Sequence, residues 1–282
     1  MNRAADLATP PAPLSDVLAS GVVAAATWRE LARRKRLLSL GFLLMLPVIM
    51  LLAVRLWYPQ GAPPDVLLSL LARYAYIPFL LPITAMAVGS PAISEPVAEG
   101  TLVYFWTRPL RRRALYLGRV MAAGLVGGVM VLVSQTLVFS VVLFGWPEAV
   151  GLDLVRLHVE MTMVVLMGTL AYTALFAAFG AGLKKPMVAA ILVAFGWENM
   201  VVDIPQRIQE WSLQFHLRNL VHWPDAAGSV DVRGFIEDLL AQALKREPVP
   251  AWESVAVLFG VIVVSTVVGV FLLRRQQLDR QG

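Results

Sequence analysis

Long apolar runs alternate with short polar segments along this 282-residue chain. A helix needs about 20 mostly apolar residues to cross a lipid bilayer. Six runs approach that length and are predicted to be membrane spans, roughly 37–57, 67–89, 116–145, 157–182, 186–203 and 252–273. The fifth run is the shortest. The pattern predicts an all-α integral membrane protein, in which residues 16–282 form one transmembrane domain after an Ala/Pro-rich, disordered tail at 1–15.

Two segments outside these spans have helical spacing. Residues 16–36 predict a short helix, because apolar side chains recur along one face and the basic cluster 33–36 follows. Such a helix typically lies along the membrane surface, although a basic flank with no further role is the alternative. Residues 204–251 form the one sizeable extramembrane block. It predicts two amphipathic helices, one opened by Pro205 and one over 232–244, that either cap the bundle or lie on the lipid.

The placement of charge predicts the topology. Only 15% of the residues are charged, against about 25% in soluble proteins. If the N-terminus is cytoplasmic, 16 of the 24 basic residues fall in cytoplasmic segments. This bias fits the positive-inside rule and predicts a multi-pass protein of the cell membrane (bacterial inner or plasma membrane), with both termini cytoplasmic and 204–251 outside. It also accounts for the net charge of +5 without a nucleic-acid partner.

The sequence offers no catalytic, cofactor-binding or metal site. There is no phosphate-binding G-x-x-x-x-G-K-[ST] loop, no G-x-G-x-x-G and no H-E-x-x-H, so the chain is not predicted to be an enzyme. There is no cysteine, which excludes disulfides. Gly124 and Gly128 have GxxxG spacing, which fits helix packing within the subunit or a dimer contact.

Two ionisable residues lie within the predicted spans. Arg73 and Glu198 are each expected about 8–9 Å below the outer surface, at 1.5 Å per residue. Because an unpaired charge at that depth is costly, the two are expected to pair. The pair would be a gate or a substrate contact, or else a purely structural ion pair; snorkelling to the surface is a further alternative.

The most distinctive segment lies between the second and third spans. Glu95 and Glu99 are one helical turn apart, Gly100 and Thr101 follow, and arginines occupy 111–113. We expect a short helix parallel to the membrane that presents both carboxylates to the cytosol, where a soluble partner can dock. The alternative is a solvated loop with ordinary flanking arginines.

This segment resembles the first cytoplasmic loop of ABC-2 type transporter permeases. The family pattern is an acidic residue, E-G-T-L, six residues, P-x-x-R and then L-G-K. Here it is Glu95, Glu99-Gly100-Thr101-Leu102, Pro109, Arg112 and Leu117-Gly118-Arg119. Arg119 replaces the usual lysine, and Arg111 replaces a frequent small polar residue. The run from Trp197-Glu198 to His216-Leu217 also resembles the family's exit from the fifth span.

The resemblance implies six spans, an interfacial elbow helix before the first and a structured outer loop before the last. It implies a permease subunit that forms an export pathway with a second permease subunit, identical or different. Two copies of a separate ABC ATPase subunit, which binds ATP and Mg, would supply the energy. Glu95, Glu99, Gly100 and Thr101 would form the coupling helix on that ATPase, with Lys184 and Lys185 as a minor contact.

Two other function classes fit the composition. One is a non-transporting membrane scaffold, or an exporter-like machine that does mechanical work on other proteins. The other is an ion-coupled secondary carrier, which would need acidic residues near the bilayer midplane. The sequence places no Asp or Glu at the centre of any predicted span.

Overall fold

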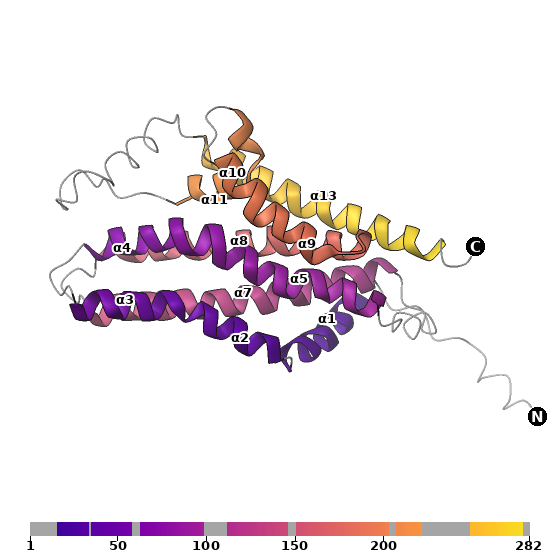
Figure 1. Ribbon diagram of the computed structural model, residues 1–282, viewed down its shortest axis with the longest axis horizontal. Helices are drawn as coiled ribbons and strands as arrows, with labels where there is room; N and C mark the ends of the chain where they lie inside the picture. Colours follow the sequence, from indigo (N-terminus) through magenta and orange to yellow (C-terminus); the bar gives the residue numbers. More distant parts are fainter. Residues whose placement is uncertain are drawn as a thin grey trace, which may run out of the picture.

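The computed structural model describes residues 16–33, 35–57, 63–98, 112–145, 151–202, 207–221 and 249–278. Every element in these ranges is helical, and the long helices lie side by side along the longest axis of the molecule (Figure 1). The first half contains α1 (Asp16–Ala32), α2 (Lys35–Leu44), α3 (Leu46–Trp57), α4 (Pro64–Leu71), the π-helix η1 (Ala72–Leu80), α5 (Leu81–Ala98) and α7 (Arg112–Gly145). The second half contains α8 (Leu152–Gly182), α9 (Pro186–Ile191), the π-helix η3 (Leu192–Trp197), α10 (Glu198–Val202), the 3₁₀-helix η4 (Arg207–Trp211), α11 (Leu213–Asn219) and α13 (Ala251–Leu278).

Within the described residues, five helices are long and apolar enough to cross a membrane. They are Lys35–Trp57, Pro64–Ala98, Arg113–Gly145, Leu152–Gly182 and Ala251–Leu273. The expected fifth span corresponds to a shorter apolar helix, Pro186–Val201. At 1.5 Å per residue its 16 residues extend about 24 Å, less than the roughly 30 Å of a bilayer core.

The second spanning helix is longer than the sequence indicates. It was expected to end near residue 89, yet α5 continues to Ala98 with Pro91 and Pro96 inside it. Glu95 therefore lies at the end of a spanning helix, and the expected separate helix parallel to the membrane is wrong for this residue. Proline is tolerated in such helices because neighbouring groups can satisfy the carbonyls that it frees.

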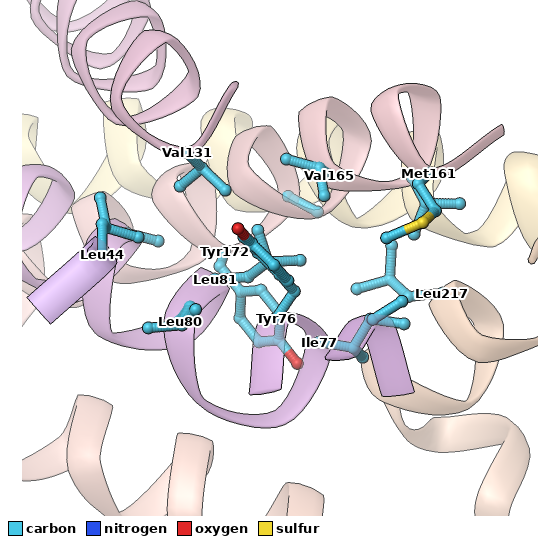
Figure 2. Packing of buried hydrophobic residues seen from close by; sticks show 14 of the residues in the cluster. Leu44, Tyr76, Ile77, Leu80, Leu81, Val131, Met161, Val165, Tyr172 and Leu217 are labelled. Atoms are coloured by element: carbon cyan, nitrogen blue, oxygen red, sulfur yellow. The ribbon is translucent and has the colours of Figure 1, made fainter. Parts of the chain in front are cut away.

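The core lies where α5 and α8 pack together. Leu81, Tyr172 and Leu217 are fully buried there, and Figure 2 shows them close together, from α5, α8 and α11. A Cβ atom on Gly168 would lie 2.8 Å from Leu81 Cδ1 and 3.0 Å from Leu217 Cδ1, so a larger residue would require these leucine side chains to shift. The GxxxG pair of α7, for its part, faces side chains of α8 and packs within the subunit.

The kink in the first span is held by two other helices. Pro47 has no N–H, and the helix breaks between α2 and α3 at Met45. Ser134 Oγ of α7 donates a 2.5 Å hydrogen bond to the Leu44 carbonyl. The same Oγ lies 2.8 Å from the Tyr76 hydroxyl of η1. The Leu44 carbonyl next to the break thus has a hydrogen-bond partner inside the bundle.

The segment before the last span folds back onto the bundle. Its elements η4 and α11 bury Gln209, Leu213 and Leu217, so this part packs against the bundle. Pro205 and the helix expected over 232–244 lie outside the described residues, as does the tail 1–15.

Helix α1 forms within the expected range 16–36 but ends at Ala32, and Lys35 already belongs to α2. It crosses α7 near the N-terminal end of α7. Ala19, Val23 and Leu31 are buried against the bundle, whereas Val17 and Val22 are exposed.

Candidate functional site

The ends of the loop between α5 and α7 lie at one end of the bundle. The turn that carries Lys184 and Lys185 lies at the same end, and so does the C-terminal end of α13 (Figure 1). Arg113, Lys184, Lys185 and Arg275 are exposed there, and we call it the basic end. Glu99, Gly100 and Thr101 lie outside the described residues.

Glu95 is joined to the beginning of the first span. Its Oε1 atom accepts a 2.6 Å hydrogen bond from Arg36 Nη2 of α2, and both side chains are about 30% exposed. Hydrogen bonds between two charged groups are shorter and stronger than neutral ones. This contact fixes α5 to α2 four residues before the loop begins.

Arg119 holds the other side of the loop. Its Nη1 atom donates a 3.0 Å hydrogen bond to the carbonyl of Ala92. In a regular α-helix that carbonyl would accept from the N–H of residue 96, but residue 96 is proline and has none. The guanidinium therefore satisfies an acceptor that Pro96 leaves open.

The charge of Arg119 is buried among three helices. The residue is only 5% exposed, and its Nη2 atom lies 3.9 Å from Glu30 Oε2 of α1. A buried charge is costly unless it is paired and hydrogen-bonded. Glu30 and the Ala92 carbonyl supply these partners, so Arg119 joins α1, α5 and α7.

The glycine of the Leu117-Gly118-Arg119 motif has a packing role. A Cβ atom on Gly118 would lie 2.5 Å from the Ser20 carbonyl oxygen and 2.8 Å from Val23 Cβ. Any larger residue would push α1 away from α7. The sequence identified this motif, but it did not reveal that α1 is its partner.

Glu198 forms a second polar site in the opposite half of the bundle. It is 2% exposed and accepts three hydrogen bonds. Ser212 Oγ donates at 2.6 Å and Gln214 N at 3.0 Å, both to Oε2, and Leu213 N donates at 3.1 Å to Oε1. The carboxylate thus satisfies backbone N–H groups in the first turn of α11, which have no partner within the helix.

The expected pairing of Glu198 with Arg73 does not occur among the described residues. The donors to the carboxylate come from residues 212–214, and these already satisfy it without a cation. Arg73 lies on η1, with its guanidinium carbon 5.9 Å from the centre of the Tyr74 ring. Sequence reasoning missed Ser212 as a partner of Glu198. Its position directly before an apolar helical run marks it as an N-cap, and its Oγ indeed accepts from Phe215 N at 3.3 Å.

His216 and Asn219 tie α11 to the last span. His216 is buried, with Nδ1 3.2 Å from Ser254 Oγ and Nε2 2.8 Å from the Glu210 carbonyl. Asn219 Nδ2 donates to the Val249 carbonyl at 2.6 Å and to Ser254 Oγ at 3.0 Å. Across the described ranges, no three metal-ligating side chains come together. These polar groups therefore fix the position of α11.

The apolar helices and their buried polar contacts define a multi-pass helical membrane protein. A family model described as "ABC-2 family transporter protein" matches residues 21–278. The chain belongs to this family, as the motif around Glu95 and Arg119 indicated. Members are membrane transport components that are not themselves catalytic and generally work with an ATPase subunit. No curated protein matches the chain.

Proposed function

We propose that this chain is the permease subunit of an ATP-driven ABC exporter in the cell membrane. The shorter helix α9–η3–α10 also crosses the membrane, as the fifth of six spans in chain order, and α1 is the elbow helix at the membrane surface. The basic end faces the cytoplasm together with both termini, because basic residues favour that side. A second permease subunit completes the pathway. Two copies of a separate ATPase subunit bind ATP and Mg.

The ATPase docks on the loop that joins α5 to α7, through Glu95, Glu99, Gly100 and Thr101. The observation that carries this proposal is the anchoring on both sides of the loop. Glu95 is bonded to Arg36 on one side, and Arg119 is bonded to the Ala92 carbonyl and lies close to Glu30 on the other. A force applied to the loop therefore reaches α1, α2, α5 and α7 together.

The turn that carries Lys184 and Lys185 is a second, minor contact with the ATPase. Both side chains are exposed at the basic end, directly between α8 and α9. Motion of the ATPase at this turn would act on the short fifth span.

The opposite half supplies the outer gate. Because three hydrogen bonds from residues 212–214 converge on Glu198, α11 is fixed to the end of the fifth span. Leu217 of α11 fills the space beside Gly168 in the core. Displacement of α11 would open this side of the bundle, and the bonds to Glu198 would have to break for that to happen.

A double charge reversal tests the docking proposal. The variant Glu95→Lys/Glu99→Lys and the matched control Asp153→Lys/Glu210→Lys change the net charge equally; the control residues are exposed and lie away from the basic end. Each tagged chain is purified from its native membranes, and co-purifying ATP hydrolysis is measured. We expect the loop variant to lose most of it and the control to keep it. Equal retention in both would refute docking at this loop.

A further inference from the structure

The corner between α1 and α2 carries an exposed basic group with no assigned role. Arg29 is exposed in the last turn of α1, Arg33 is exposed directly after that helix, and Lys35 is exposed at the start of α2. Glu30, their acidic neighbour, lies near Arg119 instead. None of these three basic residues forms an ion pair or side-chain hydrogen bond with any residue that the structure describes. Their exposed side chains can contact a partner outside the subunit.

Exposed apolar side chains continue directly from this corner. Leu38 and Phe42 of α2 are 77% and 78% exposed, on a helix that is apolar enough to cross the membrane. They are therefore positioned to contact lipid acyl chains. At 1.5 Å per residue, Lys35 lies about 4.5 Å before Leu38 along the helix axis. This spacing puts the basic corner at the level of the phospholipid headgroups.

Helix α1 has the same combination of properties. Val17, Leu18 and Val22 are exposed on its first half, and Trp28 is partly exposed next to Arg29. A helix with apolar and aromatic residues followed by basic ones lies in the interfacial region of a bilayer. An acidic soluble protein would satisfy the charges but would leave this apolar surface in water. A lipid surface satisfies both.

We infer that the α1–α2 corner is a binding site for anionic phospholipid headgroups, with Arg29, Arg33 and Lys35 contacting the phosphates. A basic residue near an anionic membrane surface strengthens binding by about fivefold. Three such residues acting together are expected to raise the preference for anionic over zwitterionic lipid by at least about tenfold, after allowance for incomplete contact. The site depends on the two helices alone and not on the identity of the transported substrate.

The test measures lipid retention by the purified chain in mixed micelles of phosphatidylglycerol and phosphatidylcholine, using native mass spectrometry. The variant Arg29→Gln/Arg33→Gln/Lys35→Gln is compared with Arg113→Gln/Arg156→Gln/Arg275→Gln, which removes the same charge from exposed positions elsewhere on the chain. We expect wild type and control to prefer phosphatidylglycerol and the corner variant to lose most of that preference. The charge-conserving variant Arg29→Lys/Arg33→Lys/Lys35→Arg should retain it.

Three results would overturn the inference. These are no preference in the wild type, an equal loss in the control, or a corner variant that keeps its lipid preference but loses a co-purifying protein. The last would identify a protein-docking surface instead.

A second measurement uses only the wild-type chain, in case the corner variant fails to fold. A photoactivatable anionic phospholipid should cross-link within residues 28–42. Excess phosphatidylglycerol should compete with it and phosphatidylcholine should not. Raising the salt from 0.1 to 1 M, which shortens the Debye length from about 10 to 3 Å, should weaken the cross-link. Cross-linking spread evenly over all lipid-facing helices would contradict a defined site.

Discussion

Replacing Glu198 by glutamine should release α11 from the bundle. The carboxylate accepts from Ser212 Oγ and Gln214 N through Oε2, and from Leu213 N through Oε1. The glutamine amide has one acceptor oxygen and one donor NH₂ group. If the oxygen keeps the Oε2 position, its NH₂ group faces the N–H of Leu213, and two donors then oppose each other. One bond is lost and the other two lose their charge.

The cost follows from the number of bonds affected. A hydrogen bond to a charged group contributes about 1.5–3 kcal/mol, against roughly 1 kcal/mol for a neutral one. Losing one such bond and reducing two others to neutral strength gives about 2.5–7 kcal/mol for the opening of α11. Since about 1.4 kcal/mol corresponds to a factor of ten, the open population should rise by at least about 60-fold.

Cysteine labelling measures this opening. The chain has no cysteine, so Val221→Cys, at a buried position just after α11, provides a single probe with a small change in volume. A membrane-impermeant thiol reagent should label the Val221→Cys chain slowly and the Val221→Cys/Glu198→Gln chain at least about 60 times faster, the lower bound of that estimate. The control, Val221→Cys/Glu210→Gln, neutralises an exposed carboxylate nearby.

Equal labelling rates in the two glutamine variants would refute the reasoning.

Adding Arg73→Gln gives a further check on the partners of Glu198. Because Arg73 forms no ion pair with Glu198 in the described part of the chain, the effects of Arg73→Gln and Glu198→Gln should add. A strong coupling between them would show that the two charges interact.

Three other changes test the anchoring of the loop and the topology. Arg36→Glu and Glu95→Lys should each destabilise the chain by about 1–2 kcal/mol, as expected for a half-exposed charged bond, and the exchanged pair should recover at least half of that in thermal unfolding. Arg119→Gln should lower the unfolding midpoint less in a Pro96→Ala background than in wild type. Alanine at position 96 has an N–H that can donate to the Ala92 carbonyl in place of Arg119. An equal loss in both backgrounds would contradict this role for Arg119. Of single cysteines at Ser15, Ser229 and Gln281, only the one at 229 should react with an impermeant reagent in intact cells, and labelling at 15 or 281 would overturn the topology.

The sequence predicted the elements that depend on local pattern. Apolar runs located the long helices, because a membrane span is defined by its own composition. The family motif located Gly118 and Arg119 at the start of α7. It did not show that Arg119 satisfies the Ala92 carbonyl, because that contact depends on how α5 and α7 are aligned in three dimensions.

The partners of Glu198 likewise could not be predicted from the sequence. Its burial within a span was visible in the sequence, and the cost of a buried charge correctly required a partner. The partner expected from equal depth was Arg73. The donors at 212–214 come instead from a segment that turns back into the bundle, and hydropathy does not reveal such a reversal. The end of α5 was also placed too early, since the helix continues through Pro91 and Pro96 to Ala98.

Site-specific cross-linking at residue 101 tests the central claim most directly. A photoactivatable residue replaces Thr101 in the docking loop, and a matched chain carries it at Asp153, which is exposed and away from the basic end. After irradiation of native membranes, the cross-linked polypeptides are identified by mass spectrometry. The account predicts that position 101, and not 153, is joined to a protein with a G-x-x-x-x-G-K-[ST] phosphate-binding loop, and that Glu99→Lys abolishes the product. No such protein at 101, or an equal yield at 153, would contradict the account.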